Sequence, residues 1–305
     1  MIYQYENAAK GLKLEVLVKV ARYAFDGTLQ KHLHNIPYEV IPGPLPTFRC
    51  CVYKEREIIR ERLVAACGQS LPNQPDGRII GVLPAACEGC PISRFRITNN
   101  CQHCLAHKCK EACHFDAITI TPKGAYIDPQ KCKECGQCAA ACPYNAISDT
   151  LRPCVRSCPV NAIGRDQYKR SVIDYNRCIS CGACVNACPF GAITDRSSLV
   201  DVIELLRKQV PATAVFAPAI EGQFGGATVG MIKKALKALG FTDAVEVSLG
   251  ADATASQEAH ELEGALAEGR KMTTSCCPAF VEMIERHFPK LSDNISHTAS
   301  PMAAV

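Results

Sequence analysis

The sequence predicts a multidomain protein of α+β and α/β architecture, on the basis of three observations. Its 305 residues exceed the usual size of one domain. Its 21 cysteines are unevenly placed, with 19 between Cys50 and Cys188 and none between Pro189 and Ser275. Predicted strands and helices alternate after Pro189, which is typical of an α/β layer around a parallel sheet. We therefore expect three regions, at residues 1–85, 86–195 and 196–305.

Residues 1–85 are expected to form a small mixed α/β region whose role the sequence does not reveal. Helices are predicted near residues 12–25 and 54–67, on either side of a proline-rich joint at residues 41–46. Cys50, Cys51 and Cys67 are interpreted as structural, because free cysteine packs as a small hydrophobic residue.

Charge and hydropathy exclude several classes of protein. The 34 basic and 30 acidic residues form no long run of one sign, so no nucleic-acid partner is expected. The N-terminus lacks a signal-peptide pattern, and no run of about 18 apolar residues occurs. We therefore expect a cytoplasmic protein with no membrane segment.

The cysteine-rich region is expected to bind iron-sulfur clusters. In a reducing cytosol, cysteines at this density favour metal ligation over disulfides. Residues 132–143 and 178–189 both have the spacing Cys-x2-Cys-x2-Cys-x3-Cys-Pro of bacterial ferredoxins, in which the fourth cysteine binds the neighbouring 4Fe-4S cube. Zinc is the weaker alternative, because structural zinc sites prefer two separated Cys-x2-Cys pairs.

The tail of this motif occurs four times, which predicts two ferredoxin-like modules with a pair of cubes each. The copies begin at Cys113, Cys142, Cys158 and Cys188. By the crossed ligand rule, the first pair of cubes is held by Cys101, Cys104, Cys109 and Cys142, and by Cys132, Cys135, Cys138 and Cys113. The spacing Cys104-x4-Cys109 is longer than standard, and His114 stands where proline is expected.

The second pair of cubes is incomplete in the local sequence. Ser148 and Leu151 stand where two ligands are expected, but Cys87 and Cys90 lie upstream with the spacing of the missing pair. We infer one cube on Cys87, Cys90, Cys154 and Cys188, and its neighbour on Cys178, Cys181, Cys184 and Cys158, which makes four cubes. The alternative is that Cys87 and Cys90 are reduced thiols or a redox pair and the site is empty, because a lone Cys-x2-Cys is a weak motif.

The region after Pro189 reads as an α/β layer. Helices are expected at residues 198–209 behind a Ser198 cap, at 228–239 before Gly240 and at 253–268, and strands at 213–217, 244–248 and 272–274. A helix that starts with proline should then run to His287. Cys276 and Cys277 follow the last strand and precede this helix, whose dipole favours thiolate, and active groups collect at such strand ends.

Several stretches of the chain match one family. They are Thr-Ser-Cys-Cys-Pro at 274–278, Phe-Ala-Pro at 216–218, Gly-Ala-Asp-Ala-Thr at 250–254 with Glu258 and Glu261, and Ser-Pro at 300–301. These resemble the first signature and flanking elements of the catalytic domain of FeFe-hydrogenases. The cysteine-rich region looks like their electron-relay domain. Residues 50–56, 86–91, 152–154 and 279–280 look most like the monomeric, ferredoxin-linked branch often called group B.

The resemblance implies an anaerobic oxidoreductase that interconverts protons and electrons with dihydrogen, with ferredoxin as electron partner. The family's H-cluster, a 4Fe-4S cube joined to a diiron centre, takes cysteines from three signatures, and only the first is present here. In it, Cys277 matches a cube ligand and Cys276 the proton-relay thiol, while Glu258, Ser296 and Glu261 match the rest of the relay.

We therefore expect the N-terminal part of a hydrogenase whose catalytic domain is incomplete, either truncated or half of a split pair. Completion of the H-cluster would take the missing part of a truncated chain or, in a split pair, a second chain that carries the rest of the catalytic domain, together with hydrogenase maturation proteins.

Two alternative interpretations and the choice of electron partner also need stating. One alternative is a non-catalytic electron-transfer subunit that carries the same cubes. Another, allowed by count alone, is that Cys277 recruits Cys50, Cys51 and Cys67 into a cube. Ferredoxin is expected rather than a nicotinamide, because no Gly-x-Gly-x-x-Gly follows a strand and the later cluster pair is mildly basic. The basic residues in question are Arg152, Arg156, Arg165, Lys169, Arg170 and Arg177.

Overall fold

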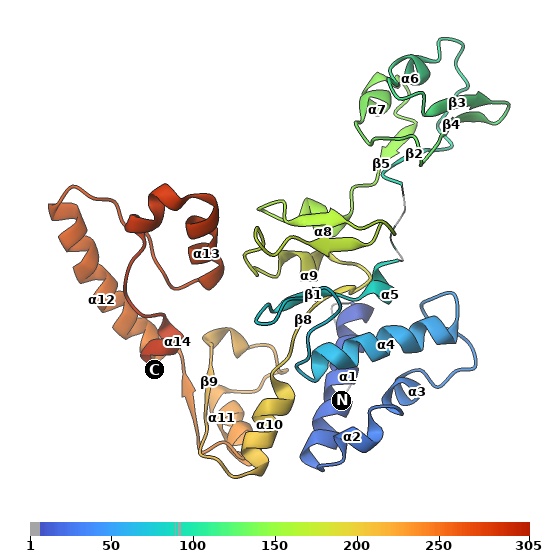
Figure 1. Ribbon diagram of the computed structural model, residues 1–305. Helices are drawn as coiled ribbons and strands as arrows, with labels where there is room; N and C mark the ends of the chain where they lie inside the picture. Colours follow the sequence, from blue (N-terminus) through green and yellow to red (C-terminus); the bar gives the residue numbers. More distant parts are fainter. Residues whose placement is uncertain (1–6, 89, 91–92) are drawn as a thin grey trace.

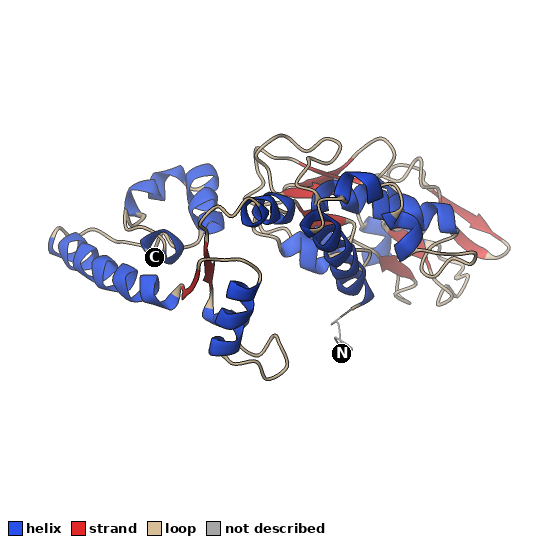
Figure 2. Ribbon diagram, turned by 90° about the horizontal axis from the view of Figure 1, so that it is seen from below, coloured by secondary structure: helices blue, strands red, loops and turns tan. Residues whose placement is uncertain are grey.

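The computed structural model describes residues 7–88, 90 and 93–305 (Figure 1). Pro91, which follows Cys90 in the upstream cysteine pair, lies outside the described residues. So do residues 1–6, which belong to the N-terminal stretch compared with a signal peptide. Helices dominate the two ends of the chain, whereas the cysteine-rich middle consists of loops with short strands and short helices (Figure 2). Within the described residues, no helix combines the length and the apolar character needed to cross a membrane.

The N-terminal part is a group of helices around one apolar core. They are α1 (Ala8–Phe25), α2 (Leu29–His32), α3 (Ile36–Val40) and α4 (Val52–Ala66). The predicted helices near 12–25 and 54–67 are confirmed as α1 and α4. Val16, Val20 and Ala24 recur every four residues on α1, so they share one face, which is buried. The same core takes Ile203 from α10 (Leu199–Arg207), which therefore packs on α1.

The first cysteine-rich module contains two antiparallel strand pairs. Strand β2 (Phe95–Ile97) pairs with β5 (Ile147–Asp149), and β3 (Ile118–Thr121) pairs with β4 (Gly124–Ile127). The short helices α6 (Lys108–Glu111) and α7 (Gln137–Ala141) carry cysteines beside them. Phe95, Ile118, Ile127 and Ile147 form the core, so each strand contributes an apolar residue between the cysteine loops.

The second module repeats this plan, but its chain is interrupted. Strand β6 (Ile163–Arg165) pairs with β7 (Ser171–Ile173), and β1 (Ile80–Val82) pairs with β8 (Ile193–Asp195). Its short helices are α5 (Pro84–Cys87), α8 (Pro153–Arg156) and α9 (Ala183–Ala187). Because β1 precedes the whole first module and β8 follows the last cysteine of the second, the first module is an insertion within the second (Figure 1).

The C-terminal part is an α/β layer with one parallel strand pair, β9 (Thr213–Phe216) and β10 (Asp243–Glu246). Around it lie η1 (Pro218–Ile220), α11 (Val229–Ala238), α12 (Ser248–Ala267), α13 (Pro278–His287), η2 (Pro289–Asn294) and α14 (Pro301–Ala304). The predicted parallel pairing, the helix before Gly240 and the proline-started helix are confirmed.

Three local details in this part differ from the predictions. The strand expected at 244–248 ends at Glu246, because its partner ends at Phe216, and α12 begins at once. The strand expected at 272–274 is a single parallel bridge between Thr273 and Ile295, because no longer partner lies beside it among the described residues. Ser198 precedes α10 without a side-chain capping bond; the hydroxyl of Ser197 accepts the Leu199 N–H instead.

Candidate metal centres

The four copies of the motif tail fold into the same turn. Each tail cysteine accepts, at its Sγ, the N–H of the alanine four residues later, at 3.2 to 3.4 Å. The third residue after each cysteine has a positive φ; these residues are Asp116, Asn145, Asn161 and Gly191. Glycine, asparagine and aspartate are the residues that most readily adopt this left-handed conformation. The turn is therefore encoded locally, and the amides it directs at sulfur would stabilise a thiolate.

The three-cysteine loops also share one backbone conformation. Positive φ recurs two residues after the first cysteine of each loop, at His103, Glu134 and Ser180. It recurs again two residues before the third cysteine, at His107, Gly136 and Gly182. The first loop keeps this pattern despite the two extra residues before Cys109, so its backbone has the same conformation at these positions as the two standard loops.

Two pockets each gather one complete crossed set of thiols. One is lined by Cys113, Cys132, Cys135 and Cys138, and the other by Cys158, Cys178, Cys181 and Cys184. Each pocket thus joins three cysteines of one loop to the tail cysteine of another copy. The remaining walls are mainly apolar, with Phe95 and Ile118 in the first pocket and Ile80 and Ile173 in the second. Four converging thiols in an apolar pocket have the donor set that a 4Fe-4S cube requires.

In the other set of the first module, three thiols lie close enough to influence one another's ionisation. Burial raises the pKa of Cys109, and the neighbouring thiols of Cys142 and Cys104 raise it further. Cys101 lies against β4, where a Cβ on Gly124 would be 3.4 Å from its Sγ. Gly124 therefore leaves room for the first cysteine of this loop.

The set Cys87, Cys90, Cys154 and Cys188 is assembled from three separate segments. Burial raises the pKa of Cys90 to about 11; Arg152 opposes this rise, while the thiols of Cys87, Cys188 and Cys154 add to it. Burial likewise raises the pKa of Cys154, with Cys188 and Cys87 as its neighbouring thiols. The structure therefore brings the four cysteines together, although the sequence separates Cys90 from Cys154 by the whole inserted module.

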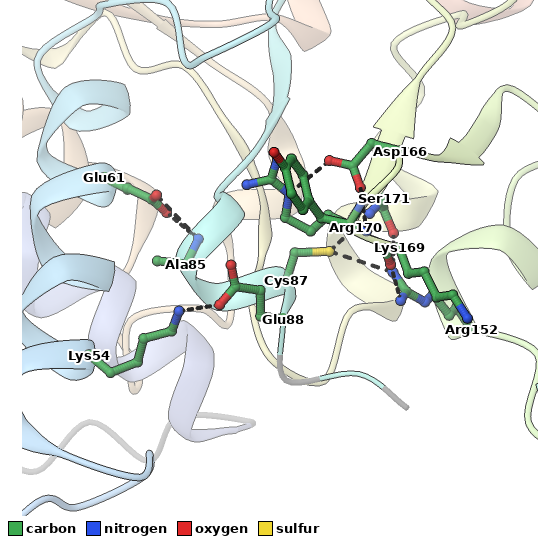
Figure 3. Close-up of polar contacts among 11 residues, drawn as sticks. Lys54, Glu61, Ala85, Cys87, Glu88, Arg152, Asp166, Lys169, Arg170 and Ser171 are labelled. Carbon is green, nitrogen blue, oxygen red and sulfur yellow. Dashed lines mark hydrogen bonds and ion pairs between the residues drawn. The ribbon is translucent and has the colours of Figure 1, made fainter. Parts of the chain in front are cut away.

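Arg152 and Ser171 lie beside Cys87 of this set (Figure 3). Cys87 Sγ accepts the Ser171 N–H at 3.2 Å and lies 3.8 Å from Arg152 Nη1. Cys154 Sγ lies 3.5 Å from Ser171 Oγ. Sequence reasoning missed Ser171 and placed Arg152 on a basic surface. That placement was wrong, since Arg152 is only 3% exposed, and its position directly before Pro153-Cys154 was the available signal.

Geometry also limits what else the cysteines can bind. Within the part of the chain that the structure describes, no three His, Cys, Asp or Glu side chains converge tightly enough to hold a single metal ion. Cys51 and Cys67 flank the 15-residue helix α4, which separates them by roughly 24 Å at 1.5 Å per residue. They cannot bind one cube, so the arrangement that joins Cys277 to Cys50, Cys51 and Cys67 was wrong.

The pair Cys276 and Cys277 is exposed at the start of α13. Cys277 is the residue before the helix, and Pro278 occupies its first turn. Two hydrogen bonds join the loop that carries these cysteines to residues 296–298. Ser275 Oγ donates to the Thr298 carbonyl at 2.8 Å, and Ser296 N–H donates to the Thr273 carbonyl at 2.8 Å. The thiols are therefore presented to solvent on a braced loop.

Of the four residues matched to a proton relay, two are in direct contact. Ser296, which is buried, donates from Oγ to Glu261 Oε2 at 2.6 Å. This bond, with those from His297 N–H and Thr298 Oγ, lowers the pKa of Glu261. Glu258 lies one turn earlier on α12, and its buried Oε1 has no hydrogen-bond partner among the described residues. Among the described residues, no hydrogen bond joins Cys276 to Glu258 or to Ser296. Cys276 Sγ lies 3.9 Å from Thr274 Oγ1.

Comparisons with known proteins match both halves of the chain. Residues 210–305 match the family described as iron only hydrogenase large subunit, C-terminal domain, and residues 125–148 and 171–194 match the 4Fe-4S binding domain. Iron hydrogenase 1 of Clostridium pasteurianum is 39% identical over 80 residues, which are 26% of this chain and 14% of that protein. The ferredoxin of Alicyclobacillus acidocaldarius is 45% identical over 53 residues, 17% of this chain and 68% of that protein.

These matches confirm the predicted order of cysteine-rich modules followed by an α/β part. They also support iron-sulfur clusters in the modules, since both matched segments contain complete three-cysteine loops. The chain covers only about a seventh of the hydrogenase that it matches.

Proposed function

We propose that this chain, which belongs to the FeFe-hydrogenase-like proteins with ferredoxin-like modules, relays electrons through four 4Fe-4S cubes to an H-cluster site at Cys276 and Cys277. Its hydrogenase-like domain and 4Fe-4S motifs mark it as an oxidoreductase. The proposed reaction is the reversible interconversion of protons and electrons with dihydrogen, with ferredoxin as the electron partner.

The observation that carries the relay is the pairing of thiols from different segments. Two pockets contain complete crossed sets, and the other two sets show mutual electrostatic influence among their thiols. The crossed arrangement is the one in which a ferredoxin-type fold holds two neighbouring cubes. When bound, the cubes supply one-electron storage at low potential. The chain's own contribution is to hold the thiols, donate amides to them and exclude water with the apolar walls.

The structure also supports an order for the relay. Helix α13 begins next to Cys277 and touches the loop that carries the set Cys158, Cys178, Cys181 and Cys184. Arg286 donates to the Cys178 carbonyl at 2.7 Å, and Met283 packs beside Val160 and Ile179. These contacts lie 6 to 9 residues from Cys277, roughly 9 to 14 Å along the helix. We infer that this cube is the one nearest the H-cluster site.

Protons would move through side chains of this chain. The proposed order is Cys276 innermost, then Glu258, Ser296 and Glu261 towards solvent, since groups that donate and accept in turn can pass a proton. The bond between Ser296 and Glu261 supports the outer step. In an assembly completed with the remaining signatures, Cys276→Ala or Glu258→Gln should slow turnover by orders of magnitude with unchanged iron content. Near-normal turnover in either variant would show another proton route.

The direct test of the relay is the iron content of the anaerobically reconstituted chain. We expect about sixteen irons per chain, and about four fewer in Cys154→Ser, because one cube loses a ligand. Cys67→Ser is the matched control and should keep the full content. A wild-type value near twelve, unchanged in Cys154→Ser, would show that the set of Cys87, Cys90, Cys154 and Cys188 is empty.

The partner and the alternative function need separate assays. Reduced ferredoxin should bleach the clusters faster than NADH does; the reverse would overturn the choice of partner. The basic character of the later cluster pair is weaker than the sequence predicts. Arg165 forms an ion pair with Glu134 and Arg170 forms one with Asp166, so part of the positive charge is neutralised. Absence of hydrogen evolution from a completed and matured assembly would favour the non-catalytic electron-transfer subunit.

A further inference from the structure

Arg152 is a buried cation whose described contacts are all neutral. Its guanidinium donates to Ser171 Oγ at 3.2 Å, to the Lys169 carbonyl and, at 3.8 Å, to Cys87 Sγ, while its buried Nε has no partner among the described residues. None of the ion pairs found in the described part of the chain includes Arg152. A buried charge without a counter-charge is costly, so the fold around Arg152 calls for an anion.

The nearby carboxylates do not supply that anion. Asp166 is engaged by Arg170 at 2.8 Å, and Glu88 is engaged by Lys54 (Figure 3). What faces Arg152 is the set of Cys87, Cys90, Cys154 and Cys188. Four thiolates around a 4Fe-4S core leave a net negative charge, which becomes more negative when the cube is reduced.

The other three sets lack this contact. Their cysteines accept hydrogen bonds only from backbone N–H groups in the described structure, at Cys113, Cys132, Cys142, Cys158 and Cys178. The Arg152 set has a backbone donor to Cys87, a backbone donor to Cys188, a hydroxyl beside Cys154 and the guanidinium. Arg62 is a second buried cation beside this set. It donates to the Gly191 carbonyl at 2.8 Å, and its charge interacts with the thiol of Cys188.

We propose that Arg152 is a positioning residue that raises the reduction potential of the cube on Cys87, Cys90, Cys154 and Cys188 above those of the other three. Hydrogen bonds to cluster sulfurs and nearby charge are two of the factors that set such potentials, and both stabilise the reduced, more negative cube. This cube then holds an electron more readily than its neighbours and acts as the electron store of the relay. The inference rests on the proposed function, because it requires the fourth cube.

The test is a redox titration of the reconstituted full chain, followed by electron paramagnetic resonance, with iron content measured on the same samples. In Arg152→Gln we expect about sixteen irons and one reduction step shifted to lower potential, with the other steps unmoved. Arg152→Lys, which keeps the charge, should shift less. Arg156→Gln is the matched control and should move no step, since Arg156 is the exposed last residue of α8 and Arg152 is the N-cap residue of the same helix.

The outcomes separate the two proposals. A wild-type chain with about twelve irons would refute the fourth cube itself, before any variant is compared. A full iron content with all steps unmoved in Arg152→Gln would overturn the role of Arg152 alone. If Arg152→Gln loses about four irons, retention of the cube and its potential in Arg152→Lys supports the role of the charge. Loss in both variants would show that Arg152 only holds the fold of the site.

Discussion

Replacing Ile203 with alanine should loosen the attachment of α10 to the N-terminal helices. Ile203 is 2% exposed and belongs to the core formed by α1, α3 and α4. Truncation of a buried isoleucine to alanine removes transfer free energy and leaves a cavity, at a cost of about 2 to 5 kcal/mol. Leu205, two residues later, is 44% exposed, and Leu205→Ala should cost about 0.5 kcal/mol or less.

Urea unfolding should be followed by two probes, because a multidomain protein need not unfold in one step. Circular dichroism reports the helices, and the visible absorbance of the cubes reports the cysteine-rich modules. Ile203→Ala should lower the helical midpoint with an unchanged slope and move the cluster signal less. If Ile203→Ala and Leu205→Ala lower the helical midpoint equally, α10 does not stabilise the N-terminal core as the packing indicates.

Two further predictions concern the surroundings of the cysteines. Gly191 and Gly182 both have positive φ, but a Cβ on Gly191 would lie 2.6 Å from Arg62 Nη2, whereas a Cβ on Gly182 would meet nothing within 4 Å. Gly191→Ala should therefore lower the thermal midpoint more than Gly182→Ala does. Equal losses in the two variants would contradict this. Burial raises the pKa of Glu61 from 4.5 to about 7, so the folded state favours the neutral acid and this contribution to stability is lost as pH rises from about 4.5 through 7. Glu61→Gln should remove that loss, so that the stability of the variant relative to wild type rises between pH 5 and pH 8 in urea titrations, and a constant difference would count against it.

Much of the candidate site was predictable because it is local. The turn after each tail cysteine depends on one residue that tolerates a positive φ, such as Asn145 or Gly191, and on an amide four residues from the sulfur. Helix α13 likewise begins at Pro278, whose missing N–H costs nothing in the first turn. Such preferences act over a few residues, so cysteine spacing and turn residues by themselves determined the cluster loops and the order of the modules.

The tertiary structure alone decided which strands pair and which side chains become buried. The ligand count had already assigned Cys87 and Cys188 to one cube, but the insertion of one module into the other follows only from the pairing of β1 with β8. The burial of Arg152 and the attachment of α10 through Ile203 are of the same kind. Neither follows from a local pattern, because burial and strand pairing depend on which surfaces of the whole chain exclude water together. Arg152 contacts Cys87, which is 65 positions away, and β1 pairs with β8, which lies more than a hundred positions further along the chain.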